Sequence, residues 1–318
     1  MSPLVSILMP AYNHERYVAD AIRSVADQDW PRIELVVVDD GSTDGTWEVL
    51  QRLQRTYARR FERFVVERQG NRGVGATENR LHELARGEFV GVIASDDQYL
   101  PGAVPAMAAK LLGDPGLGLV VGQNEFVDGE GLPCGWDAGQ NVVHDLSFAA
   151  YRTFNDYLAE TTGVSGRDPG FGTYAELVRH NHVPNGWLIR KSCWDRIGPF
   201  VPEAPLEDHW LMLQLAKIAR MAMIETPTFR YRWHAANTIR QRERMIDFAS
   251  RTMRWEEETI VRRRDHAAVD AYLAEWGRLR DERRIGKAFR FARYRTHFAS
   301  LKILELFGLR LYVRKSMV

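Results

Sequence analysis

Short apolar runs alternate with amphipathic segments through the first third of the chain. The apolar runs cover residues 5–9, 33–38, 61–66, 89–94 and 117–121. They are dominated by Val, Ile, Leu and Phe, which is typical of buried strands. Between them, apolar residues recur at helical spacing over residues 18–25, 47–57, 76–85 and 103–112. Near-continuous apolar strands separated by helices predict βαβ units, and so an α/β fold with a Rossmann-like, mostly parallel sheet flanked by helices.

Two local details are predicted at the first strand and helix. Pro10 directly follows the first apolar run and is expected to end that strand. Asn13 is expected to cap the helix that follows, and Glu15 in its first turn would favour the positive end of the helix dipole.

Polar residues follow three of the predicted strands, at the point where each strand ends. They are the pairs at 12–13 and 39–40 and the three residues at 95–97. In a parallel α/β sheet, the carboxyl ends of the strands form the edge at which ligands bind. We therefore expect the three clusters to share one ligand site.

The alternation weakens over residues 123–183, which are rich in Gly, Asp and aromatic residues. This composition predicts loops and short elements over the edge of the sheet. A strand near 187–189, a helix over 206–219 and a strand over 228–233 follow, and the chain after residue 240 has a helical pattern.

The chain has 318 residues and a formal net charge of only +1, from 43 Lys and Arg against 42 Asp and Glu. A balance this close to zero argues against a nucleic-acid polymer as the partner. The charge is unevenly distributed, however, because residues 280–318 carry eleven Lys and Arg against three Asp and Glu. An acidic body is therefore joined to a basic tail, and each needs its own explanation.

Composition and cysteine usage favour a cytoplasmic globular protein. Hydrophobic residues make up 45% of the chain and charged residues 27%, which is ordinary for a soluble globule. Cys134 and Cys193 are far apart and lack the spacing of a zinc site or a disulfide framework. The apolar stretch at 4–9 is too short for a signal peptide, and no run approaches the ~18 apolar residues of a membrane span.

Asp96 and Asp97 are the central candidates for chemistry. Adjacent carboxylates at a strand end repel one another unless a cation or hydrogen-bond donors compensate. A divalent ion such as Mg²⁺ or Mn²⁺, shared with substrate phosphates, is one reason for such a pair. A loop of solvated acids that caps the next helix is the alternative.

Other positions also have both a functional and a structural interpretation. Asp39, in an Asp-Asp-Gly-Ser run, fits turn and capping chemistry or could accept the N–H of a nucleobase. Glu207 and Asp208 open a helix, where acids favour the dipole or where one could act as a general base. His234 follows a strand, as a structural histidine or a metal ligand. The Gly-rich residues 70–75 lack the order of a dinucleotide or P-loop motif.

Together these segments resemble family 2 glycosyltransferases of the GT-A fold, over roughly residues 3–240. The matching segments, in order, are 5–13, 38–44, 71–73 with Asn79, 87–89 with 95–97, 197–200, 207–208 and 231–234. Each motif is short, but the ordered set is specific. The resemblance implies a GT-A domain at 1–240, with a nucleotide-binding half (1–122), an acceptor-side half (123–240) and a helical C-terminal extension (241–318).

Carried over to this chain, the family's motifs imply a role for each matching residue. The residues of the nucleotide-sugar site would be Pro10, Ala11, Tyr12, Asn13, Asp39, Asp96, Gly75 and Asn79. The metal would be held by Asp97, Asp96 and His234, with Asp97 the favoured ligand and the two aspartates interchangeable. Asp208 would be the catalytic base, with Glu207 beside it in the same motif.

Two positions depart from the family pattern. Ala94 stands where many relatives carry an Asp, so the D-x-D form is incomplete and the way the metal is held is altered. Glu78 precedes Asn79 where an Arg is common, which would change contacts to the pyrophosphate or pairing around the sheet edge.

The resemblance implies inverting transfer of a sugar from a nucleotide-diphosphate sugar, with Mn²⁺ or Mg²⁺ as cofactor. The acceptor would be a hydroxyl of a glycan or a lipid-linked glycan, in cell-surface polysaccharide or glycoconjugate assembly. One alternative is a sugar-nucleotide nucleotidyltransferase, which would need a Gly-rich phosphate loop where residues 11–15 have none. The other is a degenerate glycan-binding or scaffold protein, which the changes at Ala94 and Glu78 keep open.

The basic tail has apolar residues at helical spacing from Phe291 to Leu311. Such a helix could pack on the catalytic domain, join two copies in a homo-oligomer, or lie on anionic lipid at the inner face of the cell membrane. Peripheral membrane contact would suit a lipid-linked acceptor.

Overall fold

The structure is a computed structural model that describes residues 2–281, with the backbone alone at residue 273 and residues 275–281. It divides into two compact units, Met1–Glu256 and Glu257–Val318, which we describe separately. Residues 282–318, with most of the basic tail and its expected membrane or subunit contacts, lie outside the described residues. Within the described part, no helix is long and apolar enough to cross a membrane.

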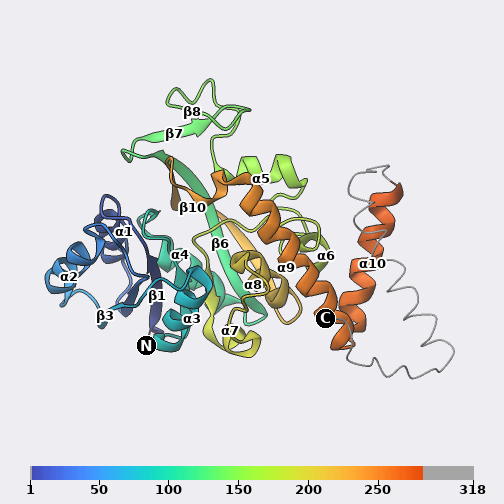
Figure 1. Cartoon of the computed structure of the whole chain (residues 1–318), viewed down its shortest axis with the longest axis horizontal. Coiled ribbons are helices and arrows are strands. Elements are labelled where there is room, and N and C mark those ends of the chain that lie inside the picture. The colour runs from blue at the N-terminus through green and yellow to red at the C-terminus, as the bar shows by residue number, and fades with distance from the viewer. Residues whose placement is uncertain (1, 282–318) are drawn as a thin grey trace. The chain divides into compact units, whose positions relative to one another are not determined.

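Strands and helices largely alternate over residues 5–128, and the rest of the first unit mixes them less regularly (Figure 1). The strands are β1 (Val5–Ala11), β2 (Ile33–Asp39), β3 (Arg63–Arg68), β4 (Phe89–Val92), β5 (Gln98–Tyr99), β6 (Leu117–Asp128), β7 (Pro133–Trp136), β8 (Val142–Val143), β9 (Leu188–Arg190) and β10 (Arg220–Trp233). The helices are α1 (Val18–Ala26), α2 (Thr46–Tyr57), α3 (Val74–Leu84), α4 (Ala103–Gly113), α5 (Phe154–Thr162), α6 (Tyr174–Leu177), α7 (Lys191–Ile197), α8 (Glu207–Ala216), η1 (Thr238–Arg240), α9 (Arg242–Arg262) and α10 (His266–Asp281).

The sheet has the strand order β3-β2-β1-β4-β9-β6-β10-β5. Strands β3, β2, β1 and β4 are mutually parallel, and β10 runs parallel to β6. Strand β9 lies antiparallel between β4 and β6, and the pair β7 and β8 extends from β6. The predicted α/β class with a sheet flanked by helices is thereby confirmed. The hydrophobic pattern could not reveal the direction of β9, because its three residues are too few to show a connection.

The register of the parallel strands brings the polar clusters to one edge. Ala11 at the end of β1 pairs with Asp39 at the end of β2, and the backbone N–H of Asp40 donates to the Ala11 carbonyl at 2.8 Å. The turn after β4 reaches the same edge, where Ser95 Oγ lies 2.8 Å from His14 Nδ1. The expected meeting of the three strand-end clusters is confirmed.

Strands β6 and β10 are longer than the sequence pattern predicts. Polar residues at 123–125 interrupt the apolar run of β6, yet the strand continues to Asp128 because it pairs with β10. Asn124 is fully buried there, with its backbone N–H bonded to Asn155 Oδ1 and its side-chain amide bonded to the Asn185 carbonyl. These two hydrogen bonds let the asparagine remain inside the strand, although its Oδ1 accepts none from the described residues.

The predictions for Pro10 and Asn13 are wrong. Pro10 lies inside β1, which β4 accompanies only as far as Leu8, so the proline has a neighbouring strand on one side only. Helix α1 begins five residues after Asn13, which instead adopts a left-handed backbone conformation with φ of 54°. Its side-chain oxygen accepts the backbone N–H of Thr43 at 2.8 Å, so it joins two loops and caps no helix.

Aromatic side chains pack around the end of β10. Trp233 lies against Trp136 with ring centroids 4.4 Å apart, and Tyr231 stacks on Phe154 at 5.2 Å. These residues belong to a buried aromatic cluster separate from the main core, which surrounds β1, β2 and α1. The cluster holds the strand that delivers the next residue, His234, to the sheet edge.

Glu256 in α9 is fully buried and makes three short polar contacts in the first unit. Its carboxylate lies 2.6 Å from Lys217 Nζ, accepts the Tyr174 hydroxyl at 2.6 Å and accepts the Gln214 amide at 2.6 Å. These contacts tie α9 to the end of α8 and to α6. A buried carboxylate needs this degree of compensation to remain charged.

We expect Glu256→Ala to lower the free energy of unfolding by about 3–5 kcal/mol, because Lys217, whose side chain is only 16% exposed, would lose its ion-pair partner. Urea unfolding followed by circular dichroism measures the change. The control is Glu258→Ala, an exposed position on the same helix, for which we expect a change within about 0.5 kcal/mol. Equal effects of the two substitutions would show that the buried contacts carry no special weight.

Candidate active site

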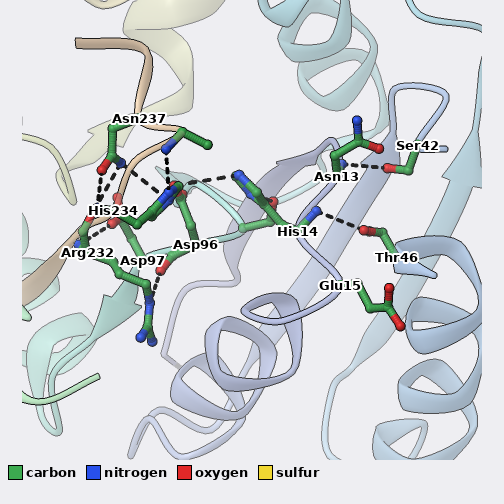
Figure 2. A network of polar contacts seen from close by, with 12 residues as sticks. Asn13, His14, Glu15, Ser42, Thr46, Asp96, Asp97, Arg232, His234 and Asn237 are labelled. Carbon is green, nitrogen blue, oxygen red and sulfur yellow. Dashed lines mark hydrogen bonds and ion pairs between the residues drawn. The ribbon is translucent and has the colours of Figure 1, made fainter. Parts of the chain in front are cut away.

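Three polar side chains from distant parts of the chain converge at the sheet edge (Figure 2). His14 comes from the loop after β1, Asp96 from the turn after β4, and His234 from the residue after β10. Asp96 Oδ2 lies 2.9 Å from His234 Nε2 and 3.7 Å from His14 Nε2. Among the described residues, this is the one group of three that could hold a metal ion, with potential ligand atoms within 4.8 Å of one another.

The two imidazoles are held by packing and by hydrogen bonds. Tyr17 stacks on His234 with centroids 4.8 Å apart and meets His14 edge to face at 5.9 Å. Burial lowers the pKa of His14, although the charge of Asp96 opposes this change. Burial alone would raise the pKa of Asp96, but the hydrogen bond from His234 and the nearby histidines lower it overall. A neutral imidazole beside an ionised carboxylate is a suitable donor set for a divalent cation.

Asp97 points away from this group and toward the backbone of β10. Its Oδ1 accepts the backbone N–H of Arg232 at 2.8 Å, and Arg232 Nε donates to the Asp96 carbonyl at 2.8 Å. Burial and the neighbouring charge of Asp96 raise the pKa of Asp97 well above its usual range. Of the two aspartates, therefore, the structure brings Asp96 to the histidines and directs Asp97 to the strand.

A cavity of about 540 Å³ opens beside the two histidines. It is lined by the loop after β1, by Asp44 and Gly129, and by residues 234–236. This volume is within the range of pockets that bind small ligands. The histidines form part of its wall, so a ligand in the cavity could reach them.

The other half of the edge is built around Asp39, whose side chain is fully buried. Its carboxylate accepts the Ser42 hydroxyl, and Ser42 Oγ in turn accepts the backbone N–H of Asn13 at 2.9 Å. Arg68 Nε lies 3.0 Å from Asp39 Oδ2, but without the alignment of a hydrogen bond. That oxygen can therefore still accept an N–H. Pro10 and Ala11 lead into this region, and Tyr12 is 44% exposed beside it.

Gly75 and Asn79 lie in α3, against the segment that contains Phe200. The Asn79 amide donates to the Phe200 carbonyl at 3.0 Å, and its oxygen accepts the Phe200 backbone N–H at 2.8 Å. A Cβ on Gly75 would stand 3.7 Å from Phe200 Cβ. The polar groups of Asn79 are thus engaged with the chain that leads to α8.

Asp208 and Glu207 occupy the first turn of α8. Together with Glu78 of α3 they form a second cluster of acidic side chains. Asn181 donates to Asp208 Oδ2 at 3.1 Å, and the backbone N–H of His209 donates to Asp208 Oδ1 at 2.6 Å. Burial and then the charge of Asp208 raise the pKa of Glu207 to about 8. Burial likewise raises the pKa of Asp208, and burial with the two neighbouring acids raises that of Glu78.

The family model described as glycosyl transferase family 2 matches residues 6–174, which is more than half of the chain. The chain belongs to this family. A protein named as the glycosyltransferase EpsH of Bacillus subtilis is 39% identical over 250 residues, which cover 77% of this chain and 65% of EpsH. Chondroitin synthase of Escherichia coli is 36% identical over 129 residues, which cover 41% of this chain and 18% of that enzyme.

Among solved structures, a mannosyltransferase of Pyrobaculum calidifontis in complex with GDP-Man and Mn²⁺ matches with a TM-score of 0.54 and 16% identity. The match covers 96% of this chain and 85% of the mannosyltransferase, and it shows that the two share the GT-A fold. The resemblance stated from the sequence motifs is confirmed at the level of family and fold. The chain matches less than two thirds of EpsH and about a fifth of chondroitin synthase.

Sequence reasoning missed two residues of this candidate site. His14 follows the Tyr-Asn pair directly, and its place beyond the first strand end was the only signal that it would face Asp96. Arg232 is 2% exposed, and a charged residue in an apolar strand gave no sign of its contacts to the 95–97 turn. Both omissions concern contacts between segments more than 80 residues apart.

We expect Asn79→Ala to lower the free energy of unfolding by about 1–3 kcal/mol, because both backbone groups of Phe200 lose their partner. If Asn79 contacted the donor directly, Asn79→Ala would instead weaken the binding of nucleoside diphosphate by tenfold, or about 1.4 kcal/mol. Urea unfolding and calorimetric titration separate these outcomes. Glu83→Ala, on the exposed side of the same helix, is the control.

We expect the free energy of unfolding to fall as the pH rises from about 4.5 to about 8, in part because of Glu207. Its pKa is higher in the folded chain than in the unfolded chain, so the folded state holds more protons throughout this window. Glu207→Gln should flatten the fall by on the order of 1 kcal/mol, since Glu207 is half-buried and partly screened by solvent. Urea unfolding at pH 5 and pH 8 measures the change in the free energy of unfolding. The same change in the variant as in the unsubstituted protein would contradict a raised pKa of Glu207.

Proposed function

We propose that this chain transfers a sugar from a nucleoside-diphosphate sugar to a hydroxyl of a glycan or lipid-linked acceptor, with inversion at the anomeric carbon. Family membership supports glycosyl transfer. The similarity to chondroitin synthase supports a role in polysaccharide or glycoconjugate synthesis. The mannosyltransferase that shares the fold binds GDP-Man and Mn²⁺, which is consistent with a nucleotide-sugar donor and a divalent cation here.

One observation carries the proposal: acids beside the two histidines and an acid at the start of α8 act on the same buried side chain. The pKa of Tyr231 is raised well above its usual range by burial and then by the charges of Asp97, Asp96 and Asp208. The histidine-flanked Asp96 and the acid at the start of α8 therefore act electrostatically on one side chain, which supports a role for both toward one substrate. A leaving group at the first and an acceptor at the second would meet between them.

Asp96 and His234 suit a divalent cation, Mn²⁺ or Mg²⁺, by their chemistry and separation. When bound, such an ion supplies charge neutralisation for the departing nucleoside diphosphate. Asp39 would accept the ring N–H of the base through Oδ2, which is paired with Arg68 at 3.0 Å but accepts no hydrogen bond. Residues Pro10 to Asn13 would line the nucleotide pocket beside it.

Asp208 is the proposed general base. It would accept the proton of the acceptor hydroxyl as that oxygen forms its bond to the anomeric carbon. The bond from this carbon to the diphosphate oxygen breaks on the opposite face, and its electron pair leaves with the diphosphate. The raised pKa of Asp208 brings its basicity closer to neutral pH, which favours proton transfer. Asn181 orients the carboxylate through its 3.1 Å hydrogen bond.

We expect Asp208→Asn to abolish sugar transfer and to leave donor binding nearly unchanged, because the amide keeps the shape but accepts no proton. The donor nucleotide is first chosen by thermal shift with UDP, GDP, dTDP and CDP in the presence of Mn²⁺, since a bound ligand raises the melting temperature. Release of nucleoside diphosphate from the matching nucleotide sugar then measures turnover.

The control for this experiment is Glu203→Gln, at an exposed acid in the segment that precedes α8. It should turn over like the unsubstituted protein. Comparable turnover by Asp208→Asn would make the base assignment wrong. Absence of any turnover or nucleotide binding in the unsubstituted protein would favour the non-catalytic, glycan-binding alternative.

A further inference from the structure

His14 and His234 face Asp96 with different hydrogen-bond arrangements (Figure 2). His234 Nε2 lies 2.9 Å from Asp96 Oδ2, a normal hydrogen-bond distance. Its other ring nitrogen accepts the backbone N–H of Ala236 at 3.2 Å. Because Nδ1 is an acceptor, the proton of the neutral ring is on Nε2, where it is donated to Asp96, and His234 would bind a cation through Nε2 only with loss of that proton.

The contacts of His14 permit the opposite arrangement. Its Nδ1 lies 2.8 Å from the hydroxyl of Ser95, which is 1% exposed and can accept the Nδ1 proton or donate to a bare Nδ1. Its Nε2 lies 3.7 Å from Asp96 Oδ2, too far for a direct hydrogen bond. With the proton on Nδ1, a bare nitrogen lone pair faces a carboxylate oxygen. Two electron-rich atoms at this separation are an unfavourable pair unless a cation joins them.

We infer that His14 is a direct ligand of the divalent cation, and that it allows the site to bind Mn²⁺ or Co²⁺ before the donor nucleotide arrives. The inference rests on the proposed function, in which a cation at Asp96 supports donor cleavage. It adds a ligand that the sequence motifs do not assign. Ser95 is its positioning residue, because the hydroxyl holds the ring through Nδ1 and so keeps Nε2 directed toward Asp96.

The ligand chemistry predicts which cation the site selects. Mg²⁺ prefers oxygen ligands and usually relies on substrate phosphates to complete its shell. Imidazole nitrogen favours later first-row ions, and affinity rises from Mn²⁺ to Co²⁺. A site with one carboxylate and an imidazole from His14 should therefore hold Mn²⁺ or Co²⁺ by itself and hold Mg²⁺ weakly without nucleotide.

The test is titration of the full chain with Mn²⁺, without nucleotide, followed by the electron paramagnetic resonance signal of the free ion. We expect His14→Gln to weaken Mn²⁺ binding by more than about tenfold, and Ser95→Ala by about tenfold, because loss of an outer-shell partner alone has that effect. His144→Gln, at an exposed histidine, should bind like the unsubstituted protein. A tenfold excess of Mg²⁺ should leave the bound Mn²⁺ in place.

A purely structural His14 would give a different result. Pulsed resonance of bound Mn²⁺ should show nitrogen coupling that weakens in His14→Gln, whereas a packing role would leave it unchanged. Unaltered Mn²⁺ affinity and coupling in His14→Gln, with Mn²⁺ still bound, would overturn the inference and leave the proposed function standing. Absence of Mn²⁺ binding in the unsubstituted protein, even with nucleotide, would instead overturn the cation requirement and the inference with it. If His14→Gln has a much lower melting temperature, the Mn²⁺ affinity of Ser95→Ala, which retains the imidazole, decides between a ligand role and a packing role.

Discussion

A single buried arginine links the segments that bring His14, Asp96 and His234 together. The backbone N–H of Arg232 donates to the Asp97 carboxylate, and Arg232 Nε donates to the Asp96 carbonyl. The turn after β4 is thereby fixed to the end of β10. The Arg232 guanidinium also lies over the Tyr17 ring at 5.0 Å. Tyr17 in turn stacks on His234. A side chain that is 2% exposed must have its charge compensated, and Asp20, whose Oδ2 lies 3.5 Å from Arg232 Nη2, carries the opposite charge while the other contacts set the geometry of the site.

Neighbouring acids in this site have different protonation tendencies because their surroundings differ. Asp96 has two imidazoles and keeps a lowered pKa, whereas Asp97, one residue later, is buried beside a like charge and has a raised pKa. Glu207 is likewise raised to about 8 by burial and by Asp208. Separated pKa values of adjacent groups are how one pocket can hold a cation at one end and a base at the other.

The fold class, the family and the meeting of the strand-end clusters could be predicted from the sequence, because apolar periodicity and short motifs are local properties. The direction of β9 and the partner of Asn79 could not, because they depend on contacts between distant segments. For the same reason, the choice between Asp97 and Asp96 as the metal ligand stays a prediction. Both follow the same strand, and only the position of β10 determines which carboxylate faces the histidines.

The two departures from the family pattern have a common physical consequence. Ala94 removes an acid from the strand end, so within the described residues the cation-type group has one carboxylate and two imidazoles. Glu78 adds an acid to the other group, where burial and the neighbouring charges keep its pKa high. Negative charge is thus reduced where the donor diphosphate would lie, whereas Glu78, whose raised pKa favours the neutral form, adds a carboxyl but little charge beside the acids of α8. A less negative group at Asp96 repels a diphosphate less, and the crowded acids of α8 hold their protons more tightly.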